Sequence, residues 1–497
     1  MEQPSQAACS PTQAVIGVSD SRPAWTTRCQ KLNVTASISA HDLTGDGVAD
    51  PIVNVVDGDA PYQVVALDGT NGTQLWGSED GITMITVAQF ADLNGDGTPD
   101  VVVGGRGVPV DDRPLVALDG SDGSTLWRVA AIEPDWRNVY TPQRVKDRDG
   151  DGVDDWLVAT GGDWLRTAAE PVTVPGRLVV VGGADGAVLA QIDLPDGQET
   201  YNSPVLVRTD EINETVLIGS GGELLPGALW KLPLDAIFER TGDAFEQVAS
   251  GDAVSSFIAP VSLGDLDRDG RTEAVALRMD GQLIAFDPSS GAQRWVSSVH
   301  DAVGALTTDA AVSSLAVPAI GQLDDDAALE VVALHTRVTA EQLASGDVYD
   351  GDSVLVVYDG ATGAVEHRLD GPAVGAVVSP LIASSGGMPG VVCACAMPLD
   401  AGGTAGTKRT DRIDLGWWQP GQVEHTPTSF GVPATESMTP LFSGVDGKFR
   451  LLSGGIFQIG DKERSIVSAI VPGGAMGPID RVEWGGYMGV NATGHGT

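Results

Sequence analysis

Basic residues are scarce in this chain of 497 residues, which has 29 Lys and Arg against 68 Asp and Glu, a formal net charge of −39 at pH 7. Proteins that bind nucleic acid neutralise its phosphates with patches of positive charge. Proteins that adsorb to anionic membranes use basic segments in the same way. The charge balance therefore argues against a nucleic-acid partner and against an anionic membrane surface.

Histidine and cysteine are also scarce, with six and four copies. The cysteines do not have the spacing of a zinc site, and the histidines form no pair with metal-ligand spacing. The sequence also lacks a nucleophile elbow, a Gly-rich phosphate loop and an HExxH motif. We therefore assign no catalytic residue, and an enzyme is less favoured than a binding protein.

The cysteines indicate disulfides and an oxidising compartment. Cys9 and Cys29 would close an N-terminal arm. Cys393 and Cys395 lie two residues apart on one predicted strand, so they share a face. They could pair together, pair with the arm or stay free.

Long hydrophobic runs are absent, so no segment is long enough to span a membrane. The N-terminus has neither the basic region nor the apolar core of a signal peptide. We interpret the chain as a mature or truncated form of an extracellular or cell-surface protein.

Aromatic residues make up only 5% of the chain, whereas glycine occurs 64 times. This composition favours many short strands and tight turns over helices, and it predicts an all-β fold.

Five short acidic segments each precede a run of Val, Ile, Leu or Ala. We call them the first to fifth acidic loops, and they span 42–50, 92–100, 147–155, 265–273 and 322–330. In the first four, oxygen-bearing side chains fall at positions 1, 3, 5 and 9, and Gly falls at position 6. Ca²⁺ prefers six to eight oxygen ligands and a tight turn, which this spacing supplies. Asp, Asn and Gly also favour plain surface turns, but four copies with one spacing favour Ca²⁺.

We therefore predict about four structural Ca²⁺ ions, held by side chains at positions 1, 3, 5 and 9 and by the backbone carbonyl at position 7. The fifth loop has Gln322 at position 1 and Ala327 at position 6, and it is assigned no ion. The predicted ligands are Asp42, Thr44, Asp46, Val48, Asp50, Asp92, Asn94, Asp96, Thr98, Asp100, Asp147, Asp149, Asp151, Val153, Asp155, Asp265, Asp267, Asp269, Arg271 and Glu273.

A second motif reads as strand, Gly-rich turn, strand, a hairpin signal. It recurs at 64–76, 115–127, 178–189, 283–295 and 355–366. Three copies end in Trp76, Trp127 and Trp295, which we expect to pack between neighbouring repeats. The acidic loop would join strands A and B, and the hairpin would form strands C and D.

The two motifs together predict an eight-bladed β-propeller of four-stranded antiparallel blades with strand A innermost, the alternative being seven blades. The domain would span 33–484, with residues 1–32 as an arm outside the repeat and 485–497 as a tail. The blades would lie at about 33–79, 82–129, 138–194, 200–249, 253–298, 313–371, 374–430 and 434–484.

These motifs resemble two families. The acidic loop with its following strand resembles the FG-GAP/VCBS repeat of integrin α-subunit propellers, and the hairpin ending in Trp is similar to the repeat of quinoprotein-type propellers. The resemblance covers most of residues 33–484. It implies a radial β-propeller with Ca²⁺ in the A–B loops. The chain departs from quinoprotein dehydrogenases because it has no adjacent Cys–Cys pair and is short for that family.

Long B–C connections are predicted at 104–114, 161–177, 335–353 and 396–411, on the face opposite the acidic loops. Long loops on a rigid scaffold often carry binding sites. Aromatic and basic residues concentrate in the connections around the second and third blades, and we predict partner binding there; the alternative is that they pack within their own loops. The residues are Arg106, Trp136, Arg137, Tyr140, Trp164 and Arg166.

The leading functional prediction is a secreted or cell-surface Ca²⁺-binding propeller that acts as a non-enzymatic scaffold for a protein or glycan ligand. One alternative is an enzyme, a polysaccharide lyase or a quinoprotein-like oxidoreductase, with a site assembled from several blades. A passive structural module of a surface assembly is the other.

Overall fold

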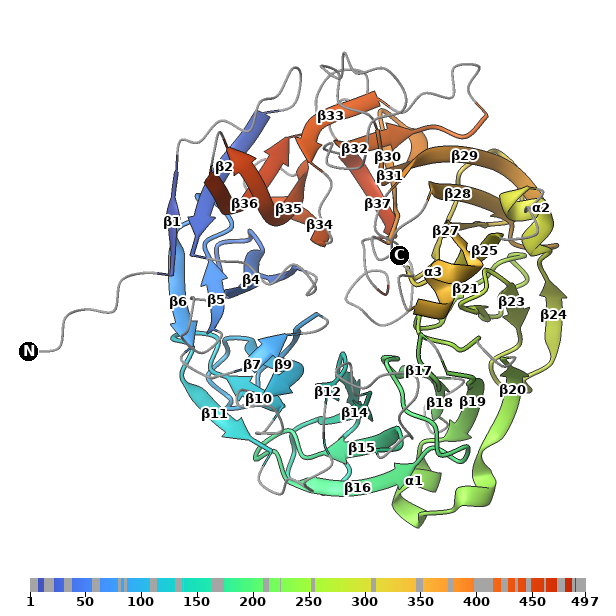
Figure 1. Ribbon diagram of the computed structural model, residues 1–497. Coiled ribbons are helices and arrows are strands. Elements are labelled where there is room, and N and C mark those ends of the chain that lie inside the picture. Colours follow the sequence, from blue (N-terminus) through green and yellow to red (C-terminus); the bar gives the residue numbers. More distant parts are fainter. Residues whose placement is uncertain are drawn as a thin grey trace, which may run out of the picture. The chain divides into compact units, whose positions relative to one another are not determined.

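The structure is a computed structural model (Figure 1), and it describes most of the chain. The described residues are 8–12, 22–30, 38–55, 63–78, 82–84, 87–107, 114–129, 136, 138–162, 174–208, 214–223, 225–251, 255–304, 310–345, 352–373, 379–396, 414–421, 428–433, 437–443, 448–459, 462–471, 479–484 and 488.

The chain divides into two compact units. Unit 1 comprises Met1–Trp156, Val181–Val188 and Thr435–Ile479, and unit 2 comprises Leu157–Val180, Leu189–Ala434 and Asp480–Thr497. Both consist mainly of antiparallel β-sheet. Among the described residues, no helix has the length and hydrophobicity that crossing a membrane requires.

Most strands of unit 1 pair antiparallel with a strand that is close to them in the chain (Figure 1). The strands are β1 (Cys9–Pro11), β2 (Arg22–Cys29), β3 (Ser39–His41), β4 (Asp50–Val55), β5 (Gln63–Leu67), β6 (Gln74–Ser78), β7 (Ile82–Met84), β8 (Gln89–Ala91), β9 (Asp100–Gly107), β10 (Leu115–Leu118), β11 (Thr125–Arg128), β12 (Asn138–Val139), β13 (Gln143–Val145), β34 (Ser437–Ser443), β35 (Lys448–Ile459) and β36 (Lys462–Val471). One sheet runs β3-β4-β5-β6, and in the next β9 pairs with β7, β8 and β10, which pairs with β11.

Unit 2 repeats the same pattern in the sheets β17-β18-β19-β20 and β21-β22-β23-β24. Its strands, including four that have residues in both units, are β14 (Asp155–Gly161), β15 (Arg177–Val181), β16 (Val188–Asp193), β17 (Val205–Arg208), β18 (Glu214–Gly219), β19 (Ala228–Pro233), β20 (Glu246–Ser250), β21 (Ser262–Gly264), β22 (Glu273–Leu277), β23 (Leu283–Phe286), β24 (Gln293–Val296), β25 (Ala310–Ser313), β26 (Ala319–Gly321), β27 (Glu330–Thr339), β28 (Asp352–Asp359), β29 (Val365–Ala373), β30 (Leu381–Ser385), β31 (Met388–Ala396), β32 (Asp414–Trp418), β33 (Thr428–Pro433) and β37 (Ile479–Trp484). The helical segments are α1 (Asp235–Glu239), η1 (Gly242–Ala244), α2 (Val299–Val303) and α3 (Ala340–Ser345).

The inner strands are buried on both faces. Every residue of β4, β10, β22 and β23 is buried. Strands that pack against sheets on both sides read as continuous apolar runs instead of alternating ones. This is why the segments after the acidic loops are rich in Val, Ile, Leu and Ala.

The N-terminal segment is part of the repeat, which corrects the prediction of an arm outside it. Strand β2 pairs antiparallel with β36 from Arg22↔Val471 to Cys29↔Ser465, and β1 pairs with β2. The sheet β34-β35-β36 therefore takes its fourth strand from the other end of the chain (Figure 1). The C-terminal strand β37, expected in that place, pairs with β35 at Phe449↔Ile479.

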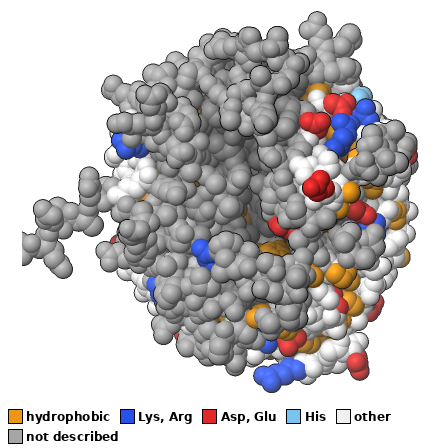
Figure 2. Space-filling model, in the orientation of Figure 1, with side chains coloured by type: hydrophobic (Ala, Val, Ile, Leu, Met, Phe, Trp, Pro, Cys, Tyr) orange, Lys and Arg blue, Asp and Glu red, His pale blue; other side chains and the backbone are white. Residues whose placement is uncertain are grey.

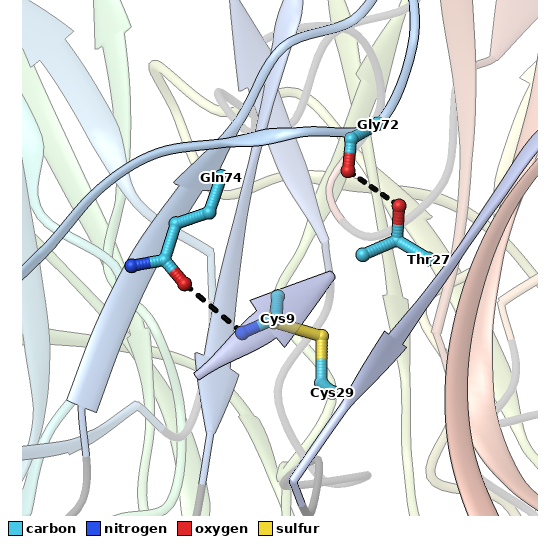
Figure 3. The surroundings of a disulfide bond; sticks show 5 residues. All are labelled: Cys9, Thr27, Cys29, Gly72 and Gln74. Carbon is cyan, nitrogen blue, oxygen red and sulfur yellow. Dashed lines mark hydrogen bonds between the residues drawn. A yellow bond between two sulfur atoms is a disulfide. The ribbon is translucent and has the colours of Figure 1, made fainter. Parts of the chain in front are cut away.

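A disulfide holds this N-terminal ladder together. Cys9 is bonded to Cys29, as expected, and the Cys9 backbone N–H donates to Gln74 Oε1 of β6 at 2.9 Å (Figure 3). The Thr27 hydroxyl of β2 donates to the carbonyl oxygen of Gly72 (Figure 3). Cys393 is also disulfide-bonded. Strand β2 is thus fixed both to β1 and to the hairpin of the first repeat.

A tryptophan on the outer strand fixes one repeat to the next. Its indole Nε1 donates to the carbonyl oxygen of the Gly that begins the next hairpin turn, at 2.7 to 2.8 Å. The pairs are Trp25–Gly69, Trp76–Gly120, Trp127–Gly183 and Trp295–Gly360. This confirms the expected packing of the three terminal tryptophans and adds Trp25 of β2 to the series.

The connection at 335–353 differs from the long loop that was predicted. Strand β27 continues through Thr339, and α3 follows it directly. Leu343 of α3 packs against Met279 and Leu315.

Candidate metal centres

Each acidic loop connects the first two strands of its repeat. The register pairs His41 with Asp50, Ala91 with Asp100, Gly264 with Glu273, and Gly321 with Glu330. Positions 1 to 8 therefore form the connecting turn, and position 9 is the first residue of the second strand.

Position 9 carries a buried carboxylate. Asp50 is 0% exposed; its Oδ2 accepts the backbone N–H groups of Leu43 at 2.9 Å and Thr44 at 3.1 Å. Its Oδ1 accepts the N–H of Gly69, in the hairpin turn, at 2.8 Å. Asp100 and Asp155 make the equivalent bonds to Gly120 and Gly183. The position-9 carboxylate therefore ties the acidic loop to the hairpin of the same repeat.

Burial also changes the titration of these carboxylates. It raises the pKa of Asp50 and Asp100, and it raises that of Asp155 to about 6. Backbone N–H donors oppose the effect of burial because they stabilise the ionised form.

Position 1 organises the exposed part of each loop. Asp42 accepts the backbone N–H groups of Gly45, Asp46 and Gly47 at 2.7 to 3.1 Å. Asp92 and Asp147 accept the equivalent Gly N–H groups. Position 6 has φ between +84° and +95° in the first four loops, so glycine is needed there.

Positions 1, 3 and 5 converge. In the third loop, carboxylate oxygens of Asp147, Asp149 and Asp151 lie within 4.8 Å of one another, and in the fourth loop those of Asp265, Asp267 and Asp269 do so. Position 3 in the first and second loops is Thr44 and Asn94, which offer neutral oxygens. The position-9 carboxylates are outside these two clusters.

An arginine side chain forms ion pairs with carboxylates of the fourth loop. Arg294 of β24 places Nη1 2.6 Å from Asp267 Oδ2 and Nη2 2.6 Å from Glu273 Oε1. The hairpin of this repeat has Pro288 where the first three have the N–H of Gly69, Gly120 or Gly183. Proline has no N–H, so this hairpin turn offers Glu273 no backbone donor at that position. The guanidinium of Arg294 pairs with Glu273 Oε1 instead.

More carboxylates lie close together at the fifth loop than its sequence indicated. Oxygens of Asp324, Glu330 and Glu366 lie within 4.8 Å of one another, and so do those of Asp326, Asp359 and Glu366. Burial raises the pKa of Glu330 to about 8 and that of Glu366 to about 7, with the neighbouring carboxylates adding to the shift. Sequence spacing missed this cluster because Asp359 and Glu366 come from the hairpin of β28 and β29.

One further polar cluster is sealed in the interior. His335 is 0% exposed; its Nδ1 lies 2.8 Å from Ser314 Oγ and its Nε2 2.8 Å from Tyr358 Oη. Burial lowers the pKa of His335 to about 4. The ring is neutral at pH 7 and has no contact with solvent, so this cluster is structural.

The predicted partner-binding aromatics are interior residues, which corrects their interpretation as surface anchors. Trp136 is 0% exposed and Tyr140 is 2% exposed. Arg106 of β9 is half-buried and pairs across the ladder with Asn138 of β12. Arg137, Trp164 and Arg166 lie outside the described residues. Isolated aromatics in a connection do not show burial through periodicity, so the sequence could not distinguish packing from exposure.

Comparison with known proteins identifies the fold. No protein-family model and no curated protein matches the sequence. Among solved structures, the chain is similar to quinohemoprotein alcohol dehydrogenase from Comamonas testosteroni, with 13% identity, a TM-score of 0.53, and coverage of 93% of this chain and 77% of that one. It is similar to a quinohemoprotein alcohol dehydrogenase from Pseudomonas putida (12% identity, TM-score 0.56, coverage 90% and 76%) and to a europium-containing methanol dehydrogenase (11%, 0.53, 95% and 89%).

These neighbours are β-propellers, and so is this chain. At 11% to 13% identity the likeness concerns the fold alone. The number of blades stays a prediction.

Proposed function

We propose that the chain is a Ca²⁺-stabilised propeller of the FG-GAP/VCBS type that serves as an extracellular binding scaffold. The observation that supports this most is the convergence of carboxylates at positions 1, 3 and 5 of the third and fourth loops. Hard cations such as Ca²⁺ prefer oxygen ligands of this kind on a tight, Gly-containing turn.

In this proposal Ca²⁺ occupies the first four loops. Side chains at positions 1, 3 and 5, with the backbone carbonyl of position 7, form the centre of each site. The position-9 carboxylate contributes only by sharing an oxygen that already accepts a backbone N–H, as Asp50 does with Leu43. The ion stabilises the connecting turn and offsets the repulsion among its carboxylates.

The fourth loop is the weakest of the four in this proposal. Ca²⁺ there competes with Arg294, which already neutralises part of the cluster through Asp267 and Glu273. At the hairpin position equivalent to Arg294, the repeats of the first three loops have Leu75, Leu126 and Leu189.

An extracellular location agrees with the disulfide between Cys9 and Cys29, because such bonds persist in oxidising compartments. The proposed ligand is a protein or a glycan. On the face drawn in Figure 2, some of the described Lys and Arg side chains lie beside Asp and Glu side chains. Arg337 forms an ion pair with Asp370 at 2.6 Å. We do not assign the ligand to an aromatic patch, because Trp136 and Tyr140 are interior.

Thermal unfolding with Ca²⁺ and with chelator tests the metal part of the proposal. Ligands that bind only the folded state raise its melting temperature by mass action. Chelator should lower the melting temperature of the parent chain, and Asp96→Ala should reduce that difference without preventing folding, because repeat stability is largely local. Asp122→Ala, an exposed acid of the 115–127 hairpin, is the matched control. An equal melting curve with and without chelator would contradict the proposal.

Glycan-array and pull-down screens, each run with Ca²⁺ and with chelator, test the binding part. The scaffold proposal expects a ligand whose capture weakens in chelator. A substrate turned over by the chain, or a quinone absorbance band, would instead favour an enzyme.

A further inference from the structure

Five carboxylates from separate segments converge at the fifth acidic loop. Asp324 and Asp326 come from the loop, Glu330 begins β27, Asp359 ends β28 and Glu366 lies on β29. The two triads within 4.8 Å share Glu366, so the five groups form one cluster. The arrangement differs from the other loops, where the converging acids belong to a single loop.

The cluster includes a buried oxygen that lacks a proton donor. Glu330 is 1% exposed, and its Oε2 accepts the backbone N–H of Leu323. Its Oε1 has no hydrogen-bond partner among the described residues. In the first three repeats the equivalent oxygen accepts a hairpin Gly N–H, but here the N–H of Gly360 donates to Leu329 O at 2.9 Å. A buried carboxylate oxygen without a partner is unfavourable, so a bound cation would stabilise it.

None of the described residues supplies a cation at this place. The register of the two hairpins makes Glu366 the counterpart of Arg294. Glu366 lies between Val365 and His367, which pair with Tyr358 and Val357. Arg294 lies in the same way between Gln293 and Trp295, which pair with Phe286 and Ala285. Where Arg294 brings a positive charge to the fourth loop, Glu366 brings a further acidic group to the fifth. Among the described residues, no Lys or Arg forms an ion pair with any of the five carboxylates.

The loss of the position-1 acid does not collapse this loop. Gln322 occupies that position, and its Nε2 donates to the carbonyl oxygens of Asp324 at 2.7 Å and Asp326 at 3.4 Å. Its Oε1 accepts from Arg268. The loop is thus held at position 1 by a neutral side chain, while Asp324 Oδ1 and Asp326 Oδ1 each accept one backbone N–H.

We propose that these five residues form a separate Ca²⁺ site, held between the fifth acidic loop and the β28–β29 hairpin. Glu330 and Glu366 form its centre, and Asp324, Asp326 and Asp359 complete it with water. The site is independent of the four loops of the proposed function, because it shares no residue with them.

The test counts Ca²⁺ ions bound per folded full-length chain by equilibrium dialysis and metal analysis. Glu366→Arg removes a central ligand and places a guanidinium among the remaining carboxylates, so this variant should bind one ion fewer than the parent. Glu239→Arg makes the same charge change at an exposed position of α1 and should bind as many as the parent. The double variant Asp96→Ala/Glu366→Arg should bind two fewer, which separates this site from the second loop.

Glu366→Gln keeps the size of the side chain and serves if Glu366→Arg does not fold; it should weaken or abolish the same ion. Glu330→Gln supplies an amide in place of the buried oxygen and should do likewise. The proposal is overturned if Glu366→Arg or Glu366→Gln, correctly folded, binds as many ions as Glu239→Arg with equal affinity.

Discussion

The indole Nε1 of Trp25 donates a hydrogen bond to the carbonyl oxygen of Gly69 at 2.7 Å. Trp25 lies on β2, which pairs with β36, whereas Gly69 lies in the hairpin turn of the first repeat. Gly72 of the same turn has φ +74°, and an added Cβ would approach the Trp25 ring to 2.5 Å. The N-terminal strand thus uses the same contact as Trp76, Trp127 and Trp295.

Removing the Trp25 side chain should therefore destabilise unit 1. Trp25→Ala should lower the free energy of unfolding by about 3–5 kcal/mol, since it empties a buried site. Trp25→Phe keeps an aromatic ring but loses the indole hydrogen bond. The lost bond should lower the free energy of unfolding by about 1 kcal/mol, in addition to the effect of the smaller ring. Urea unfolding measures both. Leu75→Ala, at a side chain 37% exposed, is the control and should change it by less than about 1 kcal/mol.

The acidic loops offer a test that separates a folding carboxylate from a metal ligand. Asp100 is buried and accepts backbone N–H groups of Leu93, Asn94 and Gly120, whereas Asp96 is exposed. Asp100→Ala should lower the free energy of unfolding by about 2–3 kcal/mol even in chelator, because buried donors lose their acceptor. Asp96→Ala should matter mainly when Ca²⁺ is present. If both variants lost the same free energy of unfolding in chelator, the distinction between a folding carboxylate and a metal ligand would be wrong.

Arg294 predicts a difference in affinity among the loops. Arg294→Leu removes the guanidinium from Asp267 and Glu273 and should increase the Ca²⁺ affinity of the fourth loop, measured by calorimetric titration. Its reference is Arg144→Leu, which breaks the exposed ion pair with Asp154 at position 8 of the third loop. An unchanged Ca²⁺ affinity in Arg294→Leu would show that the guanidinium does not compete with the ion.

His335 predicts a pH dependence of stability. Burial lowers its pKa in the folded chain to about 4, against 6.5 in the unfolded chain. The unfolded chain therefore takes up a proton between these values while the folded chain does not. The contribution of the neutral ring is complete above pH 6.5 and is lost as pH falls toward 4, by an amount on the order of 3 kcal/mol. Urea unfolding from pH 7 to 5 should show a shallower slope for His335→Gln than for the parent; parallel slopes would contradict it.

Local repetition made the propeller predictable from sequence. The spacing of Asp and Gly in each acidic loop, and the Trp that ends three hairpins, are short-range patterns that the structure explains through Asp50, Gly69 and Trp76. The role of β2 was hidden because its partner β36 lies more than 400 residues away. No short window contains both strands.

The metal clusters show the same limit. The ligands at positions 1, 3 and 5 of one loop can be predicted from sequence spacing. Arg294 and Glu366, however, lie on hairpins and contact the carboxylates of acidic loops that are distant in sequence. Only the register of the hairpin strands shows these contacts. Sequence therefore ranked the fourth loop above the fifth, whereas the geometry gives the fourth its own cation and the fifth an added carboxylate. Trp136 is buried, which its isolated position in a connection did not indicate.

The most direct test of the account is a crystal structure of the full chain grown with CaCl₂, with anomalous scattering from calcium measured. The account predicts anomalous peaks among positions 1, 3 and 5 of the first three acidic loops, with Asp46, Asp96 and Asp151 as ligands. Well-ordered loops with only water among these carboxylates, at millimolar Ca²⁺, would contradict it.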